Sequence, residues 1–378
     1  MRKYSDYIAI IVVILLSILI VFISPFIHKS KFIINNTQRN LIYEEAVVRS
    51  VDMDKLQPEA KLKDIQVGYQ DVTLEITSGK FKGQNFKVRN SISRLYNIKV
   101  KENTKVVAGI FLDGDNIQEV AIYTYKRNIV IYGLVILLFL LVLLVGKMKG
   151  LKSIVSLIFT LITIVYLMIP LMFRGISPVI AATATAVIVV FVTLYLINGY
   201  SKKTLVAIIG TTAGVFVAGV VSFVAGNLAH LSGLTLENAE SVLYIAENSG
   251  LKVQGLMFAA ILIASLGAVM DMGMSIASAI FEVHCVNGKL TPRELFRSGI
   301  NIGQDMIGTM CNTLILAFVG GSLTLILLLM SANMPSVQLM NLDVLGTELI
   351  QGLSGSIGIV LTVPITALVA SIIYKKAS

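Results

Sequence analysis

The sequence predicts an α-helical polytopic membrane protein of about eight transmembrane helices that carries a small β domain outside the membrane. Mean hydropathy is +0.83 and only 14% of the 378 residues are charged, values far from those of soluble domains. Several apolar runs reach about 18 to 25 residues, the length that crosses a hydrocarbon core of roughly 30 Å. A single long polar region, residues 28–128, instead shows the alternating pattern of β-strands.

Residues 1–27 predict an N-terminal transmembrane anchor. Their apolar run, residues 7–27, follows Arg2 and Lys3, which would also suit the start of a signal peptide. The run is longer than a typical signal core, and no small-residue cleavage site follows it. We therefore expect this segment to be retained as a membrane anchor.

Residues 28–128 predict a β domain of about five strands. "IQVGYQDVTLEITSGKFKGQNFKVRN" alternates around a glycine-containing turn, and "TKVVAGIFLDGDNIQEVAIYTYKRN" repeats the pattern with "DGDN" as its turn. "NLIYEEAVVRSVDMD" supplies an earlier strand. A small barrel of the OB type is the economical arrangement because closure removes sheet edges, and a small sandwich is the alternative. Because no pattern of stacked aromatic and basic residues marks a nucleic-acid site, we expect a docking or sensing domain.

Residues 129–378 predict a membrane domain of seven helices. Their apolar segments lie near 129–146, 153–172, 178–198, 204–227, 252–275 or beyond, 300–330 and 347–373. Alternate short loops and chain ends carry 12 Lys and Arg residues, against only Arg174 and Lys252 in the short loops on the other side. Because basic loops remain in the cytoplasm, we expect both termini inside the cell membrane and residues 28–128 outside. The net charge of +9 therefore indicates topology rather than a nucleic-acid partner.

Two of the loops carry helix signals. "TPRE" at residues 291–294 is a capping box, which predicts a short cytoplasmic helix with Leu295 and Phe296 on the membrane surface. On the other side, residues 234–250 predict an amphipathic helix that ends at Gly250.

Carboxylates occur within the apolar segment that contains "GAVMDMGMSIASAIFEV", residues 267–283. On an ideal helix, Asp271, Ser275, Ser278 and Glu282 lie at i, i+4, i+7 and i+11 and so form one polar stripe. An ionised carboxylate inside a bilayer costs a few kcal/mol or more unless it faces protein, water or an ion. The stripe is therefore a candidate functional site.

The next apolar segment repeats this spacing. Asn301, Asp305, Gly308 and Asn312 occupy the same four offsets, and Gln304 lies beside them. If the two segments form an antiparallel hairpin, Asp271 and Asp305 are expected in the cytoplasmic half, facing each other across a shared polar seam.

Three interpretations of these polar residues remain open. They can line an ion or proton pathway, or they can form a structural network that holds helices together. Glu282 can also lie outside the membrane altogether, because the segment from residue 252 to 285 is long enough to extend into the cytoplasm.

"SLGAVMDMGMSIASAIFEV" and "SGINIGQDMIGTMCNTLILAFVGGSL" resemble the YibE/F-like family of bacterial multipass membrane proteins. The resemblance extends over residues 130–375, and the order of anchor, polar domain and helical block is similar to full-length members. It implies a membrane location, but no substrate or catalytic residue, so a mechanism must be inferred from the residues themselves.

We predict a proton- or small-cation-coupled transporter in which Asp271, Ser275, Ser278, Glu282, Asn301, Gln304, Asp305 and Asn312 line the pathway. A helix break at "DMGMS" would suit a discontinuous-helix transporter, and the sequence leaves open whether residues 252–285 form one helix. The alternative is a non-catalytic membrane scaffold or permease subunit whose outer domain binds a partner. Expected partners are the lipid bilayer, a second copy or a second membrane protein, and H⁺ or a small cation.

We predict neither enzyme activity nor a cofactor or metal site. "GLSG" at residues 352–355 matches the GxSG pattern of rhomboid-type proteases, but no histidine follows Ser354. The GxGD signature of aspartyl intramembrane proteases is absent. With three histidines, two cysteines and no CxxC, HxxxH or HExxH spacing, a zinc site is not expected.

Overall fold

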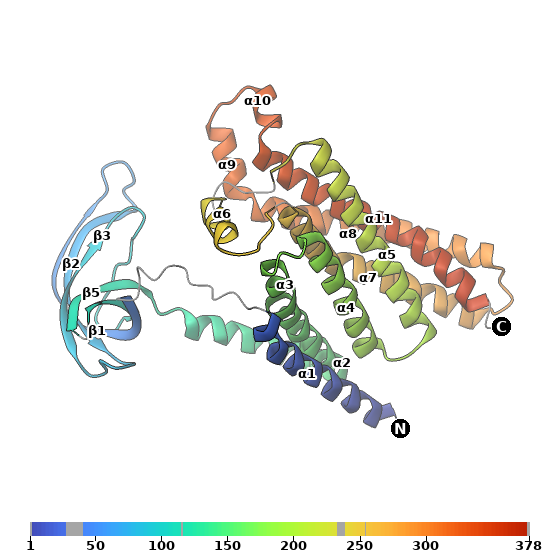
Figure 1. Cartoon of the computed structure of the whole chain (residues 1–378), viewed down its shortest axis with the longest axis horizontal. Coiled ribbons are helices and arrows are strands. Elements are labelled where there is room, and N and C mark those ends of the chain that lie inside the picture. Colours follow the sequence, from blue (N-terminus) through green and yellow to red (C-terminus); the bar gives the residue numbers. More distant parts are fainter. Residues whose placement is uncertain (1, 28–40, 115, 233–238, 254, 376–378) are drawn as a thin grey trace. The chain divides into compact units, whose positions relative to one another are not determined.

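The computed structural model describes residues 2–27, 41–114, 116–232, 239–253 and 255–375 (Figure 1). The chain divides into two compact units. The first, Met1–Phe32 with Val142–Ser378, is helical, and the second, Ile33–Leu141, contains the sheet.

The sheet unit contains the five strands that the sequence predicts. They are β1 (Leu41–Pro58), β2 (Gln66–Ile76), β3 (Asn85–Ile92), β4 (Lys105–Asp113) and β5 (Asn116–Tyr125). Their order is β3-β2-β1-β4-β5, and all neighbours are antiparallel. The outer strands β3 and β5 also contact each other, so the sheet is curled.

The long strand β1 explains how the sheet curls. Its first half pairs with β4 and most of its length pairs with β2, with register shifts between Val48 and Ser50 and between Val51 and Met53. Such bulges bend a strand and increase its twist. Alternate residues of β2 and β4, including Leu74 and Ile110, are completely buried inside the curl and form its core.

A buried amide holds the β3–β4 connection onto the sheet. Gln70 is completely buried; its amide nitrogen donates to the Val100 carbonyl at 3.0 Å, and its oxygen accepts from the Val100 N–H at 3.0 Å. Asn90 donates to the Ile98 carbonyl at 2.8 Å. These bonds satisfy backbone groups that no neighbouring strand reaches.

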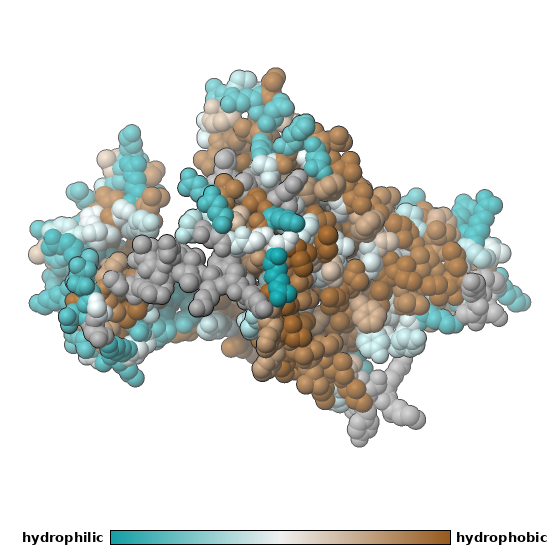
Figure 2. Space-filling view, viewed as in Figure 1, coloured by the Kyte–Doolittle hydropathy of each residue, from teal (hydrophilic) through white to brown (hydrophobic). Residues whose placement is uncertain are grey.

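The described helices run along nearly all of the rest of the chain. They are α1 (Arg2–Ile27), α2 (Asn128–Thr163), α3 (Ile169–Phe173), α4 (Pro178–Asn198), α5 (Lys202–Leu228), α6 (Ala239–Asn248), α7 (Leu256–Val286), α8 (Pro292–Gly321), α9 (Leu323–Ser331), α10 (Ser336–Met340) and α11 (Asp343–Lys375). Among the described residues, seven helical stretches are long and apolar enough to cross a membrane. Figure 2 shows apolar residues over most of the visible flank of the helices and mainly polar residues over the sheet.

One of the seven stretches is interrupted. Asn128–Phe173, which joins α2 to α3 through a π-helical turn at Ile164–Met168, has 46 residues, about 69 Å at 1.5 Å per residue. Lys147 breaks it, with φ 47° and ψ −125°. The sequence predicts separate helices at 129–146 and 153–172, and the break lies in the basic segment between them.

The core of the helical unit is built around α5, α7 and α11, which all contact one another. Glycines on α5 make this approach possible. A Cβ at Gly210 or Gly214 would overlap the hydroxyl of Thr366 or Thr362 on α11, respectively. Small residues at such positions bring helix backbones close together.

The structure answers one open question about helix boundaries and corrects one prediction. α7 is one continuous helix, which answers the question that the sequence left open at "DMGMS", and Gly273 there packs directly against Thr211 of α5. The capping box at Thr291 is present, but it starts α8 itself rather than a separate short helix. Leu295 is accordingly buried in the helical core rather than placed on a surface.

Candidate functional site

The orientation of α7 is set by its packed face. Leu262, Val269 and Ile280 on this face are buried, and a Cβ at Gly214 of α5 would lie 2.9 Å from Val269 Cγ1. Burying this apolar face against α5 and α11 leaves the opposite face of the helix outside the core.

The predicted stripe on α7 lies on that opposite face. At 100° per residue, Asp271, Ser275, Ser278 and Glu282 lie roughly 180° to 240° around the helix from Val269. Asp271 and Glu282 are exposed, and the two serines are half-buried. The stripe is therefore a polar surface of the isolated chain.

The helix α8 shows the same division. Gly299 lies under Ile280 of α7 and Ala367 of α11: a Cβ there would come 2.5 Å from Ile280 Cδ1 and 2.8 Å from Ala367 Cβ. Gly303 packs directly against Val363 of α11. These two glycines fix which face of α8 lies against the rest of the bundle.

The polar residues of α8 lie on its other side. Asn301, Asp305, Gly308 and Asn312 lie roughly 140° to 200° around the helix from Gly303. All four residues, and Gln304 beside them, are exposed. A Cβ added at Gly308 would meet nothing within 4 Å.

Both aspartates lie halfway along the helices. Gly214, near the middle of α5, packs against Val269 and Thr362, and Gly303 packs against the next residue of α11, Val363. Asp271 and Asp305 each lie two residues from this level, about 3 Å along their helix axes. Both aspartates therefore lie at nearly the same level of the bundle.

The structure does not close the two stripes into a single seam. α7 and α8 meet through Ile280 and Gly299, which belong to the packed faces, so the stripes lie away from this contact. Among the described residues, Asp271 and Asp305 have no hydrogen-bond or ion-pair partner, and no group of three possible metal ligands gathers. The isolated chain therefore presents two open polar faces.

Buried hydroxyl groups form a second polar feature, which was not predicted from the sequence. The Oγ1 atoms of Thr211 and Thr366 and the Oγ of Ser222 are buried without a hydrogen-bond partner in the described structure. Thr211 and Thr366 lie over glycines of the neighbouring helix, at Gly273 and Gly210. The signal in the sequence is the shared i, i+4 spacing of Gly210–Gly214 and Thr362–Thr366, which places each threonine over a glycine.

An ion pair between α1 and α2 was also not predicted. Lys152 Nζ donates to Asp6 Oδ1 at 2.6 Å, and only 8% of the lysine side chain is exposed. The helices predicted at 129–146 and 153–172 leave Lys152 in the loop between them, whereas it lies inside α2, where the pair joins α1 to the bundle.

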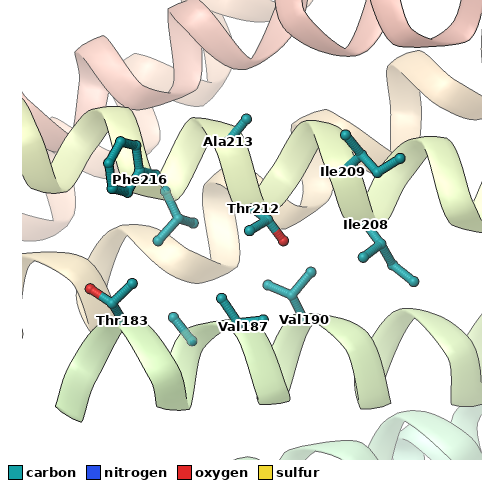
Figure 3. A pocket seen from close by; sticks show the side chains of 10 residues that line it. Thr183, Val187, Val190, Ile208, Ile209, Thr212, Ala213 and Phe216 are labelled. Atoms are coloured by element: carbon teal, nitrogen blue, oxygen red, sulfur yellow. The ribbon is translucent and has the colours of Figure 1, made fainter. Parts of the chain in front are cut away.

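An apolar groove lies elsewhere, between α4 and α5 (Figure 3). It has a volume of about 560 Å³, and its lining, which includes Val187, Val190 and Phe216, has Thr183 and Thr212 as its polar residues. Without a titratable group, this groove offers no acid–base chemistry and instead suits an apolar chain. The polar stripes therefore remain the candidate site.

Comparison with known proteins agrees with this division of the chain. A model of the YibE/F-like protein family matches residues 134–376, which include the helices from α4 to α11 and both stripes but not the sheet. No curated protein and no solved structure matches the chain. Since the matched region covers more than half of its length, the chain belongs to the YibE/F-like family.

Proposed function

We propose that this chain is a polytopic protein of the cell membrane that couples to protons or small cations through Asp271 and Asp305. One observation supports the proposal most: both carboxylates lie halfway along apolar, span-length helices, on faces that the bundle does not pack. At that depth an ionised carboxylate is costly unless it meets water, a cation or another chain. Ser275, Ser278, Asn301 and Asn312 extend each carboxylate into a stripe of oxygen and amide groups.

In the proposed topology the chain crosses the membrane eight times. The stretch Asn128–Phe173 is about twice as long as one crossing requires, so the break at Lys147 would lie in the cytoplasm between two crossings. The distribution of basic residues then puts both termini inside and the sheet unit outside. Its strand order, with β3 near β5, supports a partly open barrel of the OB type.

Flux in liposomes tests the transport proposal. The purified chain is reconstituted, and proton and cation flux is recorded for the wild type, Asp271→Asn and Asp305→Asn. Glu240→Gln, at an exposed carboxylate on α6, is the matched control. We expect flux in the wild type and the control and its loss in both aspartate variants. Undiminished flux in a folded Asp271→Asn/Asp305→Asn double variant would contradict the proposal.

The second candidate is a non-catalytic membrane scaffold or permease subunit. The two open polar faces favour it, because a partner chain could cover them in place of water or ions. No flux under any gradient, together with purification in a fixed ratio with a second membrane protein, would support this function over the first.

A further inference from the structure

The outward face of α8 is chemically unsuited to lipid. We name Asn301, Gln304, Asp305, Gly308 and Asn312 the α8 polar face; all are exposed, and α7 and α11 contact the opposite side of the helix. Burying an amide or a carboxylate in hydrocarbon without a hydrogen bond costs several kcal/mol. In the membrane position proposed above, this face therefore needs a polar cover along several helical turns.

The residues of this face are complementary to themselves. An asparagine or glutamine amide both donates and accepts hydrogen bonds, and a carboxylate accepts them. When two identical faces meet about a two-fold axis, Gln304 of one chain can donate to Asp305 of the other, and the reverse bond follows by symmetry. Such reciprocal bonds would give each carboxylate a hydrogen-bond donor from the other chain.

The shape of the face also suits a second helix. The offsets i, i+4, i+7 and i+11 follow the spacing of a helix–helix packing seam. Gly308 lies within the seam with open space at its Cβ position, so two backbones can approach closely at that point. Asp305 and Asn312 then lie on either side of the crossing.

We propose that this chain forms a homodimer in the membrane through the α8 polar face. The dimer rests on the proposed membrane location and not on transport, so each can fail without the other. A dimer without flux would support the interface and contradict transport. Flux from a monomer would support transport and contradict the dimer.

Disulfide crosslinking in native membranes tests the dimer. In a background with Cys285→Ser and Cys311→Ser, cysteine is introduced by Gly308→Cys or Asn312→Cys. Val187→Cys is the control, because Val187 is an exposed residue halfway along α4. We expect oxidation to give a species of twice the 41.0 kDa chain for both α8 variants and not for the control. Equal crosslinking of the control, no crosslinking, or a product of another mass would overturn the proposal.

A second measurement keeps the test independent of cysteine chemistry. Asn301→Leu/Asn312→Leu removes amides that do not contact the bundle, so the monomer should fold as before. We expect about tenfold weaker dimerisation, equivalent to about 1.4 kcal/mol, in subunit-exchange measurements in lipid. Unchanged dimerisation in this variant would overturn the assigned interface.

Discussion

Single residues in the sheet unit show how charge and backbone geometry act together. The Glu59 carboxylate forms an ion pair with Arg94 and accepts the N–H groups of Leu62 at 2.7 Å and Lys61 at 2.9 Å. The hydrogen bond from Arg94, followed by these backbone bonds, lowers the pKa of Glu59 below its ordinary value. The ionised carboxylate therefore fixes the turn between β1 and β2 to the segment after β3.

This arrangement predicts an acid-sensitive turn. A carboxylate whose pKa is lower in the folded chain stabilises the fold above its unfolded pKa of about 4.3 and loses that contribution as the pH falls through the folded pKa. We expect hydrogen-exchange protection of residues 59–65, corrected for intrinsic rates, to fall at acidic pH in the wild type. Glu59→Gln should weaken protection at pH 7 and flatten its pH dependence. The same pH profile in wild type and Glu59→Gln would contradict this account, and Glu102→Gln, at an exposed carboxylate, is the control.

At the scale of helices, the contact between α5 and α11 should depend on having no side chain at Gly214. Its Cβ would overlap Thr362 Oγ1 and lie 2.9 Å from Val269, so the helices must separate to admit even a methyl group. We expect Gly214→Ala to destabilise the bundle by about 1–3 kcal/mol, the usual cost of overpacking. The measurement is the thermal midpoint of the purified chain in detergent.

The control for Gly214 is a glycine on α7 with free space. A Cβ at Gly267 would meet nothing within 4 Å, so Gly267→Ala should leave the midpoint unchanged or raise it, because alanine favours helix by up to about 1 kcal/mol. Equal losses at both positions would show that the close contact at Gly214 does not determine stability.

The same helices show what the sequence can predict and what it cannot. The stripe on α7 follows from periodicity alone, since residues i, i+4 and i+7 share a face of any helix. What the stripe faces does not follow from periodicity, because periodicity cannot say which face of α7 the neighbouring helix contacts. α7 and α8 contact each other through Ile280 and Gly299, on their packed faces, and the stripes are therefore left uncovered. Likewise, "DMGMS" has the composition of a helix break, but Gly273 serves close packing against Thr211.

At the scale of the whole molecule, the two units treat their polar side chains differently. The sheet unit satisfies buried amides internally, as Gln70 and Val100 do. The helical unit leaves amides and carboxylates on the surface of apolar helices, where only a further chain, water or an ion can satisfy them. The stripe residues follow from helical periodicity, whereas the burial of Gln70 and the exposure of the stripes depend on packing between distant segments.

In the proposed membrane topology, the break at Lys147 would decide which side of the membrane every later loop occupies. If Asn128–Phe173 crosses twice, Cys285 lies on the side opposite to the sheet unit, and if it crosses once, Cys285 lies on the same side. Cys285 is exposed, and so is Leu95 of the sheet unit at 89%, so both positions suit an impermeant maleimide. Two variants are compared, and both carry Cys311→Ser. We expect the variant with Leu95→Cys and Cys285→Ser to be labelled in intact cells. We expect the variant that retains Cys285 to be labelled only after permeabilisation. If Cys285 and Leu95→Cys were both labelled in intact cells, Asn128–Phe173 would cross the membrane only once. The turn at Lys147 would then be a kink within the membrane.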